Sequence, residues 1–234
     1  MQKILNNRQP DHKGKQRYNP GLIYSKRYGE NATADLYTAK YAAEDGTLLW
    51  DRREVGESYG TDSAQAVVVD ASGEAFVTGT LHRSYHPDMF TARYAAADGS
   101  RLWEQTYNGP ANGGEFARAL AFDPSGKVIG SGSSLGTNGS HDFYTAAYDM
   151  EFGGLLWERR YDGPAGGEDF ATGLSVDALG RVVVTGDSWS RRGPDFYTAQ
   201  YSPLDGALEW EQRYNSRSPG SGHGAAAAVD RRGN

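Results

Sequence analysis

One seven-residue pattern recurs four times along the 234 residues of this chain, at intervals of 53 or 54 residues. Each copy has the form Asp-x-aromatic-Thr-Ala-x-Tyr or its close equivalent, and the copies begin at Asp35, Asp88, Asp142 and Asp195. A repeat of this length is one supersecondary unit, and such units become stable by stacking on one another. The repeat therefore constrains the fold more strongly than any other feature of the sequence.

Every unit contains four candidate β-strands separated by turn signals. In the third unit, Tyr144, Ala146 and Tyr148 alternate with other residues, so they share one face of a strand. A hairpin turn with glycine follows, and then a strand that carries tryptophan. The other two strands are joined by a turn with aspartate first and glycine fourth, such as Asp123 to Gly126. Each unit is therefore expected to form one antiparallel sheet.

The order of the strands follows from side-chain size. One strand of each unit has a face of small residues, for example Ala117, Ala119 and Ala121. Small side chains are expected where strands crowd around a central axis, so this strand is placed innermost. The pattern predicts an all-β fold, a β-propeller of four-stranded antiparallel blades, with complete blades at about 63–107, 116–161 and 169–214.

The remaining segments predict a fourth blade shared between the two termini. Residues 35–54 would give its outer two strands and residues 224–230 its innermost strand, which removes an exposed edge. The segment Leu22–Tyr28 would supply the missing second strand, or else it is the outer strand of an earlier blade. We expect a polar, poorly ordered tail over 1–21 and the propeller over 22–234. A fragment of a larger ring is the alternative.

Glycine stands four residues before the tryptophan of every unit, at Gly46, Gly99, Gly153 and Gly206. With this feature the region from 35 to 234 resembles the β-propeller repeat found in many exported bacterial proteins. It is also similar, more weakly, to the tryptophan-docking repeats of quinoprotein-like propellers. The first resemblance implies an extracellular or envelope-associated module, often part of a larger protein, with no established chemistry.

Composition excludes several classes of partner and site. The net charge of −6 is spread along the chain, which argues against nucleic acid and against an anionic membrane surface. The chain has no cysteine, so disulfides and thiolate metal sites are excluded. The polar start of the chain has no apolar run of the length that a signal peptide or membrane insertion needs. The localisation stays open, and we expect no cofactor.

Catalytic and metal-binding patterns are not found. No histidine pair has metal-ligand spacing, and no serine lies in a G-x-S-x-G turn, so we predict no catalytic residue. The turn aspartates, such as Asp177, are explained as turn formers, so no metal site is predicted. The repeated tryptophans are interpreted as packing residues, because they recur at the same place in every unit: Trp50, Trp103, Trp157 and Trp210.

The loops that follow the valine-rich strands differ between units, although the strands repeat. In the predicted blade they lie on one rim, together with Glu115, Glu168, Asp169 and His223. Variable loops on a repeated scaffold are typical recognition surfaces. The candidate ligand-binding residues on this rim are Arg83, Tyr85, His86, His141, Trp189, Arg191 and Arg192.

We therefore expect a non-enzymatic binding or scaffold module that recognises a protein or glycan through the rim. The first alternative is a quinoprotein-like or hydrolytic propeller enzyme with its site at the mouth of the axis. The second is a purely structural fragment of a longer repeat array. The identity of the ligand is not contained in the sequence.

Overall fold

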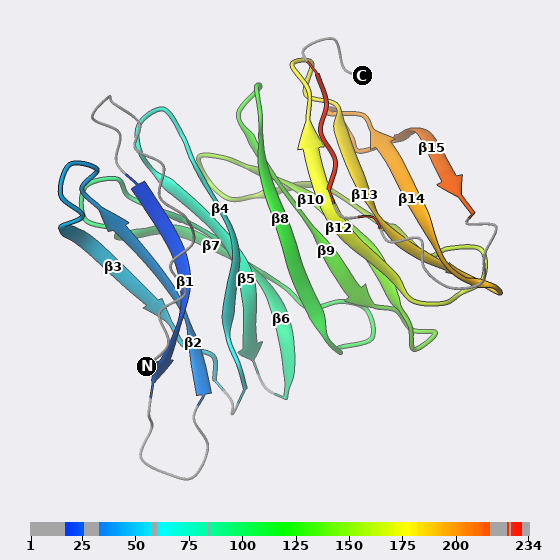
Figure 1. Ribbon diagram of the computed structural model, residues 1–234, viewed down its shortest axis with the longest axis horizontal. Helices are drawn as coiled ribbons and strands as arrows, with labels where there is room; N and C mark the ends of the chain where they lie inside the picture. The colour runs from blue at the N-terminus through cyan, green and yellow to red at the C-terminus, as the bar shows by residue number, and fades with distance from the viewer. Residues whose placement is uncertain are drawn as a thin grey trace.

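The computed structural model describes residues 17–25, 33–57, 60–83, 85–215, 224 and 226–230. Within these ranges the chain forms fifteen β-strands, arranged as four antiparallel sheets. The same ranges contain no helix of the length and apolarity needed to cross a membrane. The sheets follow one another along the molecule in chain order, with the two termini at opposite ends (Figure 1).

Three of the sheets have four strands in the predicted order, each strand paired with the next along the chain. The second sheet consists of β4 (Ser63–Val69), β5 (Ala75–Arg83), β6 (His86–Tyr94) and β7 (Arg101–Tyr107). The third consists of β8 (Glu115–Asp123), β9 (Lys127–Leu135), β10 (His141–Asp149) and β11 (Leu155–Tyr161). The fourth consists of β12 (Asp169–Val176), β13 (Val182–Ser190), β14 (Gly193–Tyr201) and β15 (Leu208–Tyr214). The predicted boundaries of the three complete units are confirmed.

The first sheet has three strands: β1 (Arg17–Ser25), β2 (Thr33–Tyr41) and β3 (Leu48–Glu54). β1 pairs with β2 on the side away from β3, so it occupies the position of a second strand. The interpretation of Leu22–Tyr28 as an outer strand is therefore wrong. The strand begins at Arg17, inside the region 1–21 that was expected to be a tail. Residues 1–16 and 26–32 lie outside the described residues.

The predicted pairing of the C-terminal segment with N-terminal sequence is also wrong. Among the described residues, the first sheet contains no C-terminal strand. Residues 224 and 226–230 lie instead beside the fourth sheet, where the backbone N–H of Gly224 donates to Asp187 Oδ1 at 2.7 Å. Figure 1 shows this segment in red, near β12 and β13 and away from β1. The C-terminal segment and β1 therefore belong to different sheets.

The core consists of three hydrophobic clusters, each between two successive sheets. Trp50, Trp103 and Trp157 are 6–9% exposed, and each indole lies on the glycine turn of the next sheet. At Gly99, for example, an added Cβ would lie 2.6 Å from the Trp50 ring, and φ is +69°. Only glycine fits such a position. The packing interpretation is confirmed for these three tryptophans.

The fourth tryptophan departs from the prediction. Trp210 is 41% exposed, because no described hairpin follows the fourth sheet and covers its indole. The innermost strands β4, β8 and β12 contact one another in sequence, as the small-residue argument predicts. Each of them also contains a β-bulge, after Ala64, Ala117 or Ala171, which shifts the alternation within the strand.

Candidate functional site

The variable loops lie on one edge of the sheets, as predicted. This edge, called the rim below, includes the β5–β6, β9–β10 and β13–β14 hairpins and the connections 108–114 and 162–168. Antiparallel pairing places the ends of β5, β9 and β13 beside the starts of β4, β8 and β12. The rim therefore collects loops from three consecutive sheets. Ser84 and His223 lie outside the described residues.

The first group of predicted site residues lies on the β5–β6 hairpin. Tyr85 is 92% exposed and His86 is also exposed. Arg83 is half-buried, and its Nη2 lies 3.2 Å from Glu104 Oε1. Tyr85 and His86 are therefore free to meet a ligand, whereas Arg83 is partly engaged by its own sheet.

His141 joins two sheets. Its ring lies between Phe116 and Phe170, with centroid distances of 5.6 and 5.5 Å. Its Nδ1 lies 2.9 Å from Glu168 Oε2, which also accepts the backbone N–H of His141 at 3.2 Å. The contacts on both faces of the ring give His141 a packing role between the third and fourth sheets.

The third group lies on the β13–β14 hairpin. Trp189 belongs to β13, and not to the loop as predicted, but it is still 43% exposed. Its backbone N–H donates to the carbonyl oxygen of Glu168 at 3.1 Å, so it lies next to the residue that holds His141. Arg191 and Arg192 are exposed at the turn. The structure thus places His141 near the Trp189 group and leaves Tyr85 on a separate sheet.

A repeated set of buried carboxylates shapes the rim from below. Glu115 and Asp169 begin innermost strands and Asp62 directly precedes one, and all three are 0–3% exposed. Asp169 accepts the N–H groups of Gly163 at 2.5 Å and Trp189 at 3.1 Å, and so fixes a connection and a strand end together. Burial raises the pKa of Glu115 to about 7. Glu115 and Asp169 were already expected on the rim, and the recurrence of an acid at the start of the small-faced strand is the sequence signal that could have added Asp62.

Arginines from the outermost strands complete this layer. Arg213 Nη2 donates to Tyr161 Oη at 2.7 Å and to Ser188 Oγ at 2.6 Å, while Nη1 lies 3.1 Å from Asp195 Oδ2. Arg160 makes the equivalent contacts one sheet earlier. The contact between Arg213 and Tyr161 joins the fourth sheet to the third, and the contact between Arg160 and Tyr107 joins the third sheet to the second. Each arginine therefore connects neighbouring sheets at the rim. Sequence reasoning missed both arginines, although they are 53 residues apart.

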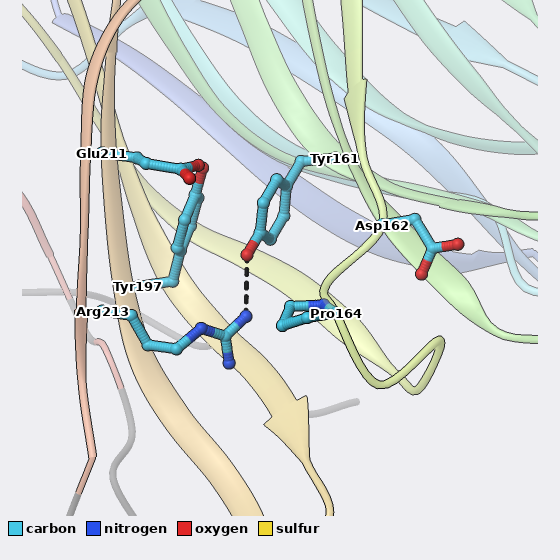
Figure 2. A pocket seen from close by; sticks show the side chains of 6 residues that line it. All are labelled: Tyr161, Asp162, Pro164, Tyr197, Glu211 and Arg213. Carbon is cyan, nitrogen blue, oxygen red and sulfur yellow. Dashed lines mark hydrogen bonds between the residues drawn. The ribbon is translucent and has the colours of Figure 1, made fainter.

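A hollow opens between the third and fourth sheets at this point. Its volume is about 350 Å³, and Figure 2 shows the six side chains that line it. The rings of Tyr161 and Tyr197 stack at 4.0 Å. The lining combines aromatic and proline rings with two carboxylates and one guanidinium: Tyr161, Tyr197, Pro164, Asp162, Glu211 and Arg213. Rings with a few charged groups are a typical composition for a binding site.

Three carboxylates gather beside this hollow, with Asp142 and Asp169 buried and Asp162 exposed. One oxygen from each lies within 4.8 Å of the others. However, Arg160 Nη2 lies 2.7 Å from Asp142 Oδ2. Burial also raises the pKa of Asp142 and of Asp169, which weakens both as ligands for a cation. The local contacts favour an internally neutralised cluster over a metal centre.

Comparison with solved structures identifies the type of fold. No protein-family model matches the chain, and no curated protein matches it. Among solved structures, the Dos1 propeller is similar with a TM-score of 0.56 and 12% identity, over 86% of this chain and 47% of that chain. The quinohemoprotein alcohol dehydrogenase ADHIIG from Pseudomonas putida HK5 is similar with a TM-score of 0.52 and 16% identity, over 83% of this chain and 33% of that chain. A europium-containing methanol dehydrogenase is similar with a TM-score of 0.51 and 13% identity, over 88% of this chain and 45% of that chain.

The chain has a β-propeller fold. Its four sheets are consecutive blades, and the outer strands of the first three dock on the hairpin turn of the next blade. The chain spans half or less of the length of these similar structures. At identities of 12–16%, the likeness establishes the fold and not an activity.

Proposed function

We propose that this propeller is a non-enzymatic binding module that recognises a protein or a glycan through its rim. The observation that carries the proposal is the contrast between the repeated strands and the exposed, unrepeated side chains above them. Tyr85, Trp189, Arg191 and Arg192 are all exposed on the rim. Aromatic residues and arginine are the side chains most often responsible for binding energy.

The hollow between the third and fourth blades supplies the second part of the proposed site. Trp189 follows Ser188 in the chain. The Oγ of Ser188 accepts a hydrogen bond from Arg213, which lines the hollow. Trp189 itself does not line the hollow, so we propose the hollow as a second contact region on the same rim. Because Arg213 is held by Tyr161 and Asp195, this part of the site is organised before a ligand arrives.

The chemistry of the buried acids supports binding over catalysis. Glu115 and Asp88 have raised pKa values, chiefly because burial disfavours their charged forms. Glu115 is 0% exposed and Asp88 is 5% exposed, so neither presents a proton to a substrate at the surface. General acid–base catalysis requires the group to reach the reacting atom. We assign these acids to the support of the rim.

We further infer kinship with the propeller repeat of exported bacterial proteins, from the Gly-x-x-x-Trp spacing of every unit. An extracellular or cell-envelope location would follow from that kinship. No nucleic acid and no membrane insertion are part of this function. Fractionation of cells that express the native gene tests the location, and a cytosolic product would contradict it.

The function is tested by a binding screen with immobilised wild-type chain against a glycan array and against extracts that contain candidate proteins. The test variant is Tyr85→Ala/Trp189→Ala/Arg191→Ala. The matched control removes exposed apolar side chains from the opposite edge: Phe152→Ala, Leu179→Ala and Leu204→Ala, which are 73–85% exposed in the wild type.

We expect a ligand retained by the control and lost by the rim variant, with both variants folded by circular dichroism. The array and the extracts separate a glycan from a protein ligand. Undiminished binding by the rim variant would move the site elsewhere. Redox or hydrolytic turnover by the wild type would replace the binding hypothesis with the enzyme alternative.

A further inference from the structure

The fourth blade exposes side chains that the preceding blades bury. Trp210 is 41% exposed, whereas Trp50, Trp103 and Trp157 are 6–9% exposed at the same place in the repeat. Phe196 is only partly buried, while its counterpart Phe143 is 1% exposed. The last blade therefore carries an unfilled copy of the surface that joins every other pair of blades.

The last outer strand shows the same difference. Tyr107 and Tyr161 stack on tyrosines of the following blade, at 3.8 Å from Tyr144 and 4.0 Å from Tyr197. Tyr214 occupies the equivalent position on β15 and is 67% exposed. The indole of Trp210 and the phenol of Tyr214 thus lie on one side of the fourth blade, where no further blade of the described residues covers them.

The first blade carries the complementary vacancy. Gly99, Gly153 and Gly206 each have a tryptophan ring 2.6 Å from the place of an added Cβ. Gly46 has the same positive φ, +76°, but no described atom lies within 4 Å of that place. Within the described ranges, nothing fills the place on this turn that a tryptophan occupies in the other blades.

The first blade also lacks an inner strand among the described residues. β5, β9 and β13 each pair on both sides, whereas β1 pairs only with β2 there. The register shows that β1 is a true second strand, because Gly21 lies opposite Tyr37 just as Gly79 lies opposite Phe90. An edge suited to one more strand is therefore present on this blade.

The C-terminal segment already lies where an inner strand of a following blade belongs. Phe196 approaches Gly224, whose added Cβ would lie 2.8 Å from the phenyl ring. In the preceding pair of blades, Phe143 packs in one cluster with Ala171, the counterpart of Gly224 in the repeat. An added Cβ on Gly173 would lie 2.8 Å from Ala226 Cα, so the segment runs along β12.

We propose that two copies of this chain associate head to tail and complete one another's propeller. Trp210 of one copy docks on the partner's Gly46, and residues 226–230 become the inner strand beside the partner's β1. β1 belongs to the first blade and residues 226–230 lie against the fourth, so these two segments do not pair within one copy (Figure 1). The same contact already joins successive blades three times, so a second copy offers a surface known to fit.

Closure by two copies satisfies both ends at once. A head-to-tail contact forms a ring when the rotation closes and an open filament when it does not. The closed dimer leaves neither the tryptophan face nor the β1 edge exposed, which is the reason to prefer it to a filament.

Sedimentation velocity over a range of concentrations tests the association. The wild type should form a dimer, and both Trp210→Ala and Gly46→Asn should weaken it by at least about 30-fold, the effect of losing a central interface residue. Asparagine tolerates the positive φ but would fill the space for the indole. Phe152→Ala changes an exposed residue of the third blade, away from the first and fourth blades, and should dimerise like the wild type.

Mixing the two variants identifies the head-to-tail geometry. Trp210→Ala has an intact first blade and Gly46→Asn has an intact last blade, so the mixture regains one good contact. A 1:1 complex should appear at concentrations where each variant alone is monomeric. A face-to-face dimer would give no such rescue and would overturn the proposal.

Cross-linking tests the strand that is completed by the second copy. Val67 pairs with Val77 in the second blade, and the counterparts of these residues are Ala227 and Asn19. The chain has no cysteine, so Ala227→Cys and Asn19→Cys introduce single thiols. Under oxidation, the mixture should form a disulfide between different copies well above the level of each variant alone. A wild type that stays monomeric, or a mixture that cross-links no better than its components, would refute the proposal.

Discussion

Replacement of Trp157 by alanine measures how strongly one blade holds the next. The Trp157 side chain is 6% exposed and belongs to the cluster between the third and fourth blades. A buried tryptophan removes about 150–250 Å² from water, which at about 25 cal/mol per Å² gives about 4–6 kcal/mol as an upper bound. Partial collapse of the cavity lowers this value, so we expect a loss of about 3–5 kcal/mol.

Trp189→Ala is the control, because Trp189 is 43% exposed and water already reaches the space it occupies. We expect a loss of about 1 kcal/mol there, the ordinary effect of a surface truncation. Urea unfolding followed by circular dichroism gives both values, at a protein concentration where the wild type and both variants are monomeric. Equal losses at the two positions would refute the assignment of Trp157 to blade packing.

Two further predictions concern the acids beneath the rim. Stability should fall as the pH rises from about 4.5 to about 7, because Glu115 has a folded pKa of about 7 against an ordinary value of 4.5, so the unfolded chain releases its proton first. Glu115→Gln should flatten this part of the stability profile, whereas exposed Glu151→Gln should not, and an unchanged profile would contradict the assignment. Millimolar Ca²⁺ should leave the melting temperature unchanged, because Arg160 and the N–H groups of Gly163 and Trp189 already occupy oxygens of Asp142 and Asp169. A rise in melting temperature that Asp162→Asn abolishes would show a metal site.

Local patterns predicted the blades, because each blade is specified by short-range features. Alternation defines the strands, and glycine with positive φ defines the turns, as at Gly99 and Gly126. The strand order followed from the small residues of the innermost strand. These signals lie within one unit, so a single sequence contains them.

The relation between distant segments could not be predicted in the same way. The pairing of residues 224–230 with the N-terminus assumed a closed ring in one chain, whereas among the described residues the first blade contains no C-terminal strand. Trp210 is exposed because no described blade follows the fourth one. Its position in the repeat is identical to that of the buried tryptophans, so the sequence pattern does not reveal the difference. The packing of His141 between Phe116 and Phe170 depends on three separate elements, and no local pattern indicates it.

Docking of each blade on the next is tested most directly by a double-mutant cycle between Trp103 and Gly153. These residues belong to successive blades, and an added Cβ on Gly153 would lie 2.6 Å from Trp103 Cδ2. Gly153→Ala should therefore be less destabilising in the Trp103→Ala background, with a coupling of about 1–3 kcal/mol. Gly126→Ala, at a similar positive φ but with no atom within 4 Å of its added Cβ, should add to Trp103→Ala without coupling. Coupling of Gly153 with Trp157 of its own blade, and none with Trp103, would contradict the docking of successive blades.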